Sequence, residues 1–195
     1  MSSEQGTRPL VVSFVGASGV GKTTIIESLI PLLAESGLSV GTVKHASHGF
    51  EVDREGSDSW RHQAAGARMV LLGGAGAAVL FLEGSPQTRT GGSHHHGPSP
   101  SADASDLTSL VTAHMGGLDV VLAEGFMPLS DRVVEMGRSG VARKDVTSGP
   151  AVWVRITDAT TRGPDELAFD ELPRLAELIS DELRSSTSPK ETTDG

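Results

Sequence analysis

Eight consecutive residues near the amino terminus have the types and spacing of a loop that binds phosphates. In the pattern G-x-x-x-x-G-K-[ST], backbone N–H groups surround the phosphates, the lysine reaches the β- and γ-phosphates, and the final hydroxyl binds Mg²⁺. The residues that fit it are Gly16, Ala17, Ser18, Gly19, Val20, Gly21, Lys22 and Thr23. We therefore predict a nucleotide-phosphate site in which Lys22 is a catalytic cation and Thr23 is a metal ligand.

The segments on either side of this loop favour the same interpretation. The apolar run 10–15 before it predicts a buried strand. After it, Thr24 opens a segment whose apolar side chains recur at helical spacing up to Leu33, with Pro31 expected to cost one helix hydrogen bond. The phosphates would then lie at a helix N-terminus, and Thr24 would join the phosphate-binding set. A glycine-rich turn carrying a surface lysine is the alternative, and these flanking elements argue against it.

A magnesium site beside such a loop needs an acid at the end of a neighbouring strand. Residues 118–124 are an apolar run that ends on Glu124. A glutamate reaches about one bond further than an aspartate, which suits a contact through water. We predict that Glu124 is catalytic as a metal partner, directly or through water; a solvated acid at a strand end is the alternative.

A polar segment follows the predicted strand 38–45 and holds several groups that could meet a ligand. Within 18 residues the chain carries Lys44, His45, His48, Asp53, Asp58 and Arg61. Open α/β sheets bind ligands at the carboxyl ends of their strands. We expect this segment to meet the γ-phosphate or a second phosphorylated ligand, with Asp53 positioning water or metal as a catalytic residue. Asp58 is expected to cap a short helix over 59–65.

Composition limits the class of protein. The 195 residues carry a formal net charge of −9, which argues against a nucleic-acid binder. The absence of cysteine excludes disulfides, thiolate metal sites and cysteine nucleophiles. No apolar run approaches the roughly 20 residues that span a bilayer, and no signal peptide is recognisable. We expect a soluble cytoplasmic protein without membrane or nucleic-acid partners.

The remaining periodicities predict an α/β fold with a mostly parallel sheet flanked by helices. A short glycine connection between 68–72 and 77–82 predicts an added antiparallel hairpin. The other expected elements are a helix near 107–111, strands at 133–136 and 151–156, and a final helix over 169–183. We predict a flexible N-terminus over 1–9, one domain over 10–184 with a flexible insertion at 84–104, and a disordered tail over 185–195.

Three of these segments resemble the molybdopterin-guanine dinucleotide biosynthesis adapter proteins, the MobB family. The phosphate loop and the following Ile30-Pro31 are the first. Residues 43–61 resemble the family's K-H-x-x-H-x-x-x-x-D-x-x-G-x-D-[ST]-[YW], which is the most specific of the three. Residues 119–126 resemble D-x-[IVL]-[IVL]-[IVL]-E-G-F. The resemblance covers nearly the full chain.

The resemblance implies a P-loop fold that dimerises, binds GTP with Mg²⁺ and hydrolyses GTP slowly. It also implies an adapter for the guanylyltransferase that attaches GMP to molybdopterin, with molybdopterin as a bound or delivered ligand. Lys44, His45, His48 and Asp53 would line the surface beside the phosphates. Two positions depart from the family: Met127 replaces a lysine after Glu124-Gly125-Phe126, and Val133 stands at another lysine position, with Arg132 beside it. A cation for the pterin phosphate is therefore displaced or missing.

Two other classes of protein are compatible with the phosphate loop. A nickel metallochaperone GTPase would use the histidines at 94–96, but such GTPases read guanine with N-K-x-D, and this chain contains no asparagine. A small-molecule kinase would need a lid of cations, for which Arg132, Arg138, Arg143 and Lys144 are available. Without N-K-x-D, we expect Asp158, after the predicted strand 151–156, to accept hydrogen bonds from guanine.

Overall fold

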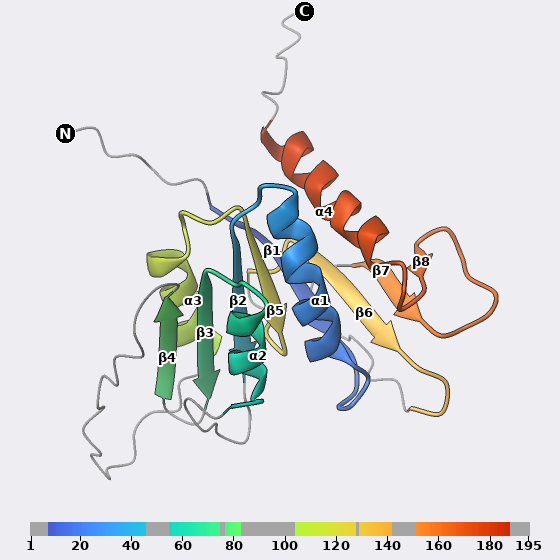
Figure 1. The fold of residues 1–195 in the computed structure, drawn as a ribbon, viewed down its shortest axis with the longest axis horizontal. Coiled ribbons are helices and arrows are strands. Elements are labelled where there is room, and N and C mark those ends of the chain that lie inside the picture. Colours follow the sequence, from blue (N-terminus) through green and yellow to red (C-terminus); the bar gives the residue numbers. More distant parts are fainter. Residues whose placement is uncertain are drawn as a thin grey trace, which may run out of the picture.

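The structure, a computed structural model, describes residues 8–45, 55–74, 77–82, 104–127, 129–141 and 151–187. They form an α/β fold with one eight-stranded sheet in the order β4-β3-β2-β5-β1-β6-β7-β8 (Figure 1). The strands are β1 (Leu10–Val15), β2 (Val40–His45), β3 (Met69–Gly74), β4 (Ala77–Leu82), β5 (Val120–Glu124), β6 (Arg132–Gly137), β7 (Val152–Thr157) and β8 (Glu166–Leu167). The helices are α1 (Lys22–Glu35), α2 (Asp58–Ala64), α3 (Ala104–His114) and α4 (Leu172–Thr187).

All strand pairs are parallel except β3 and β4, which form the antiparallel hairpin that the glycine connection predicts. Strand β1 lies between β5 and β6, and its Phe14 is in register with Glu124 of β5. Because the pairing is parallel, the carboxyl ends of β2, β5, β1, β6 and β7 meet at one edge of the sheet. The predicted α/β class with a mostly parallel sheet and a hairpin is confirmed.

Alternation along β1 divides the core into two layers. Val12 and Phe14 face a cluster that includes the buried sides of α1 and α4, whereas Val11 faces a second cluster with Met115 after α3. Successive strand residues point to opposite faces, so a strand covered on both sides is apolar throughout. Helices α1, α2 and α4 accordingly lie over one face of the sheet and α3 over the other (Figure 1).

Several boundaries differ from the expected ones. Helix α2 is capped by Ser57, whose side chain accepts from Trp60 N at 3.3 Å, so the predicted cap at Asp58 is wrong. Helix α1 continues through Pro31 to Glu35. Strand β8 has two residues, too few for a periodicity to predict.

The predicted domain limits also shift. Helix α4 runs to Thr187, three residues into the predicted tail, and α3 begins at Ala104, the last residue of the predicted insertion. Arg8, assigned to the flexible N-terminus, pairs with Asp131 at 3.0 Å. No helix in the described ranges is long and apolar enough to cross a membrane.

Candidate functional site

The predicted phosphate loop connects β1 to α1 and depends on two unusual glycines. Gly21 precedes the helix with φ 103°, a left-handed conformation that favours glycine. Gly16 has φ 150°, and a Cβ there would lie 2.5 Å from the carbonyl oxygen of Met136 on β6. The loop therefore packs directly against the end of β6, and only a residue without a side chain permits this approach.

The side chain of Lys22 lies over this loop. Its Nζ donates to the carbonyl oxygens of Gly16 and Ala17 at 3.0 and 2.8 Å. Ser18 and Gly19 at the loop tip are exposed, whereas Val20 is buried and anchors the loop to the core. A cation at the start of α1 adds to the positive end of the helix dipole, so the loop suits an anion.

Next to the loop, a hydroxyl, two carboxylates and an ammonium group converge from four elements. Thr23 Oγ1 donates to Glu124 Oε2 at 2.9 Å. Lys44 Nζ lies 2.6 Å from Glu124 Oε1 and 2.5 Å from Asp58 Oδ2. We call Thr23, Lys44, Asp58 and Glu124 the carboxylate cluster.

The strand register explains this cluster. Lys44 and Glu124 are partners in the parallel pairing of β2 with β5, and each is a strand's last or next-to-last residue. The side chains of Glu124 and Lys44 are 8% and 17% exposed, so both charges are removed from most of the solvent. Charges buried to this extent need a partner of opposite charge, and Lys44 and Glu124 are partners of each other.

Asp58 completes the cluster from the first turn of α2. Burial alone would raise the pKa of its carboxyl, but the hydrogen bond and charge of Lys44, with a hydrogen bond from Thr23, hold that pKa below its usual value. Asp58 is therefore ionised at neutral pH. The sequence predicts Asp58 as a helix cap and as one of the polar residues after the second strand; it lies two residues after Gly56 in the D-x-x-G-x-D pattern.

The donor set of the cluster fits Mg²⁺. This ion prefers hard oxygen ligands and usually keeps several of its waters. The Thr23 hydroxyl and the Glu124 carboxylate are already within hydrogen-bond distance of each other, and a second carboxylate lies across Lys44. Thr23 and Glu124 would hold the ion, and Lys44 is the cation that now balances the carboxylates.

His62 lies on the buried face of α2, on the same side of the sheet. Its imidazole is fully buried, and neither ring nitrogen has a hydrogen-bond partner among the described residues. Burial, followed by the charge of Lys44, lowers its pKa to about 4. The ring is therefore neutral at physiological pH.

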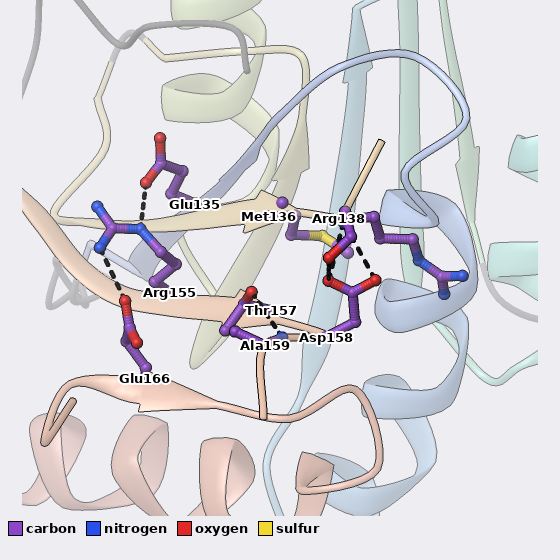
Figure 2. Close-up of a pocket in the computed structure, with 10 residues that line it drawn as sticks. Glu135, Met136, Arg138, Arg155, Thr157, Asp158, Ala159 and Glu166 are labelled. Carbon is purple, nitrogen blue, oxygen red and sulfur yellow. Dashed lines mark hydrogen bonds and ion pairs between the residues drawn. The ribbon is translucent and has the colours of Figure 1, made fainter. Parts of the chain in front are cut away.

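Asp158 lies apart from this cluster. It follows β7, which is separated from β5 by β1 and β6, and its carboxylate accepts from Ser139 N at 2.9 and 3.1 Å and from Ser139 Oγ at 3.0 Å. The hydrogen bond from the Ser139 backbone lowers the pKa of the Asp158 carboxyl. Both residues line a pocket at the ends of β6 and β7 (Figure 2).

The predicted site residues are thus only partly brought together. Thr23, Lys44 and Glu124 converge beside the loop, and Thr24 is exposed on the first turn of α1. His45 ends β2 next to Lys44, half-buried. His48 and Asp53 lie outside the described residues, as do the histidines at 94–96 and two of the predicted lid cations, Arg143 and Lys144.

The family described as "Molybdopterin guanine dinucleotide synthesis protein B", MobB, matches residues 11–158, which is more than half of the chain. The chain belongs to the MobB family. The predicted resemblance is confirmed.

Two relatives are described as molybdopterin-guanine dinucleotide biosynthesis adapter proteins. The one from Escherichia coli strain K12 is 28% identical over 135 residues, 69% of each chain. The one from Haemophilus influenzae is 45% identical over 62 residues, 32% of this chain and 35% of the relative. The alignment therefore spans about a third of the length of the Haemophilus protein.

Two solved structures share the MobB fold with this chain. A crystal structure of molybdopterin-guanine biosynthesis protein B matches with a TM-score of 0.50 and 24% identity, covering 90% of this chain and 99% of the other. Bacillus subtilis MobB matches with a TM-score of 0.50 and 23% identity, covering 89% and 97%.

The structure explains one departure from the MobB pattern, the valine at position 133. Val133 is fully buried on β6, where a lysine would have no solvent. Arg132, its neighbour, begins β6 and pairs with Glu182 of α4 at 2.5 Å. Arg132 therefore lies at the amino end of β6, the opposite end of the strand from the phosphate loop.

Proposed function

We propose that this chain binds GTP with Mg²⁺ on its phosphate loop and acts as an adapter for a molybdenum cofactor guanylyltransferase. The observation that carries the nucleotide part is the carboxylate cluster beside the loop, where Thr23 contacts Glu124 at 2.9 Å. A phosphate-binding loop with a hydroxyl and an acid at this separation is the arrangement that a magnesium nucleotide requires. The adapter role and the molybdopterin ligand come from family membership and the names of the relatives.

Each residue has a task in this proposal. Lys22, now bonded to two loop carbonyls, exchanges these for the β- and γ-phosphates and neutralises their charge. Thr23 and Glu124 orient the bound metal, which when present offsets charge on the same phosphates. In the absence of metal, the ammonium group of Lys44 offsets the repulsion between the carboxylates of Asp58 and Glu124. His45, His48 and Asp53 remain proposed contacts for the γ-phosphate side or for a second phosphorylated ligand.

Turnover of GTP by the isolated chain is expected to be slow. Fast hydrolysis needs an arginine or a glutamine aimed at the attacking water or the γ-phosphate. Arg61 reaches the first turn of α1, where its Nη2 lies 3.4 Å from Thr24 Oγ1, and it forms an ion pair with Glu27. Its charge is thus already balanced, so a partner or a second subunit would have to complete the site.

A homodimer is also part of the proposal, on the strength of family resemblance. The edge strands of the sheet are β4 and β8. Leu82 on β4 and Val152 on β7, the neighbour of β8, are exposed apolar side chains that a second copy could cover. Light scattering during size-exclusion chromatography gives the mass in solution. A monomer across the micromolar range would contradict this part alone.

Calorimetric titration with GTP, in Mg²⁺ and in EDTA, tests the nucleotide part. Binding of one GTP per chain, weakened by at least tenfold in Lys22→Ala, is expected, because the lysine charge contacts two phosphates. Unaltered binding in that variant would show that the loop is not the site. Tight nickel binding that is lost when the histidines at 94–96 become alanine would favour the metallochaperone class, and rapid transfer of phosphate to an acceptor would favour a kinase.

A further inference from the structure

A pocket of about 280 Å³ opens between the ends of β6, β7 and β8. Arg138 and Asp158 lie at one end of the drawn site, and Arg155 with its ion-pair partners Glu135 and Glu166 lies at the other (Figure 2). Ser139 and Thr157 also line the pocket. None of these lining residues belongs to the phosphate loop or to the carboxylate cluster. The pocket is slightly smaller than the roughly 300 Å³ at which sites for drug-sized ligands begin, so it fits one part of a nucleotide.

The pocket adjoins the phosphate loop. The carbonyl of Met136, which lines the pocket, is the group that a Cβ at Gly16 would strike at 2.5 Å. A Cβ at Gly21 would lie 3.7 Å from the guanidinium of Arg138 and 4.0 Å from the ring of Phe169. The pocket wall and the loop are therefore in van der Waals reach of each other.

The carboxylate cluster and the pocket lie on opposite sides of the loop. The cluster is built on β5 and β2, to one side of β1, and the pocket on β6 and β7, to the other. A triphosphate on the loop whose terminal phosphates face the metal-binding carboxylates must direct its nucleoside away from them. That direction leads to the pocket.

We infer that this pocket binds the guanine base, with Asp158 accepting from its N1 and N2 hydrogens and Arg138 forming the surface on which the base stacks. The inference rests on the GTP binding proposed above and adds the residues that select the base. It replaces the N-K-x-D motif that this chain lacks.

The chemistry of Asp158 favours guanine over adenine. Ser139 fixes the carboxylate with its N–H and its hydroxyl, and two carboxylate oxygens offer about four acceptor positions in all, so capacity remains. Guanine presents two N–H donors on its N1–N2 edge, which an acceptor-only carboxylate satisfies. Adenine presents the N1 lone pair at the same place, which an ionised carboxylate repels.

The position of Arg138 suits stacking. Its guanidinium carbon lies 4.2 Å from the centroid of the Phe169 ring, so the aromatic ring supports the planar cation from one side. Arginine planes stack on nucleic-acid bases as well as on aromatic side chains. Phe169 follows β8, which explains why this two-residue strand matters to the pocket: it brings the ring beside the end of β6.

An exchange of nucleotide preference tests the assignment. Xanthine keeps the N1 donor of guanine but has an acceptor at position 2, and the amide of an asparagine matches that pair. In Asp158→Asn, we expect GTP affinity to fall at least tenfold and XTP affinity to rise at least tenfold in calorimetric titrations with Mg²⁺. Asp181→Asn, on the exposed face of α4, is the matched control and should change neither. An Asp158→Asn protein that keeps its preference for GTP over XTP overturns the inference.

Additional binding measurements distinguish a failure of this inference from a failure of the GTP-binding proposal on which it rests. Wild-type protein that binds no GTP overturns both, whereas Lys22-dependent GTP binding with unaltered preference in Asp158→Asn overturns the pocket assignment alone. If Asp158→Asn does not fold, Arg138→Ala decides: it should weaken GTP about tenfold and leave inorganic tripolyphosphate binding unchanged. Equal effects on both ligands, or no effect on GTP, contradict a stacking role.

Discussion

Lys44 and Glu124 are register partners on β2 and β5, and the lysine Nζ lies 2.6 Å from Glu124 Oε1. The same ammonium group contacts Asp58 at 2.5 Å, so one cation joins two carboxylates beside the phosphate loop. The Mg²⁺ of a bound nucleotide would place positive charge beside these carboxylates. Without it, Lys44 supplies that charge. This relationship makes the stability of the site, and not only its ligand affinity, depend on Lys44.

The variant Lys44→Met keeps the side-chain stem and removes the charge. Two neighbouring carboxylates are then left without their cation, and we expect the free energy of unfolding to fall by about 2 to 3 kcal/mol. Added Mg²⁺ should recover part of the loss, since it can take the place of the ammonium group. Urea denaturation with and without Mg²⁺ measures both effects. Arg174→Met, in an exposed pair with Glu177, is the control and should cost under about 1 kcal/mol; a similar small loss in Lys44→Met would contradict the account.

Replacement of Thr23 by valine removes a hydroxyl without changing the shape of the side chain. We expect GTP binding in EDTA to be nearly unchanged and the enhancement by Mg²⁺ to fall about tenfold or more, because the hydroxyl is the proposed metal ligand. Parallel calorimetric titrations in the two buffers give the ratio. A variant with the full Mg²⁺ enhancement would remove Thr23 from the metal site.

Gly16→Ala tests the close approach of the loop to β6. The new Cβ would lie 2.5 Å from the Met136 carbonyl oxygen at a backbone φ of 150°, so we expect a loss of about 2 kcal/mol in unfolding free energy and weaker GTP binding. Gly137→Ala provides the control, since nothing lies within 4 Å of its added carbon. Thermal unfolding of the two variants, compared with wild type, distinguishes a specific clash from a general intolerance of alanine. Equal midpoints would argue against the packing described.

His62 predicts a pH dependence of stability. Burial and the charges of Lys44 and Arg61, opposed by Asp58 and Glu27, together lower its pKa from 6.5 to about 4. The unfolded chain therefore takes up a proton near pH 6.5, and the folded chain only near pH 4. Stability should be level above pH 6.5 and fall by about 3 kcal/mol as the pH drops toward 4.

Substitution isolates that contribution. His62→Gln cannot titrate, so the slope of unfolding free energy between pH 6.5 and 4 should decrease by most of this amount, whatever the variant's absolute stability. His114→Gln, at the exposed end of α3, is the control for the loss of a histidine. Denaturant titrations at four or five pH values supply the slopes. An unchanged slope in His62→Gln would show that its ring is not held neutral.

Sequence patterns predicted those parts of the molecule that depend on residues close together in the chain. The phosphate loop lies in eight consecutive residues, and the apolar run before Glu124 predicts both the strand and the edge at which the acid lies. Strand β8 has only Glu166 and Leu167, too short to show any alternation. Its existence depends on pairing with Arg155 and Ile156 of β7.

The sequence names Asp58 and Asp158, but which side chains surround each of them depends on tertiary packing. Asp58 has the sequence context of a helix cap, and it meets Lys44 of β2 because α2 packs against α1 and β3. The pocket draws Arg138, Asp158 and Glu166 from three separate segments, and Phe169 lies against Arg138, with no shared spacing that a pattern could detect. Charge pairing across elements and stacking across loops become visible only in three dimensions.

The most direct test of the account is a reconstituted reaction. Purified chain is mixed with a molybdenum cofactor guanylyltransferase, GTP, Mg²⁺ and molybdopterin cofactor, and the guanine dinucleotide product is quantified over time. We predict faster or more extensive dinucleotide formation with the wild-type chain and at least tenfold less stimulation with Lys22→Ala. Equal stimulation by both proteins, or none by the wild type at saturating GTP, would contradict an adapter that acts through nucleotide held on this loop.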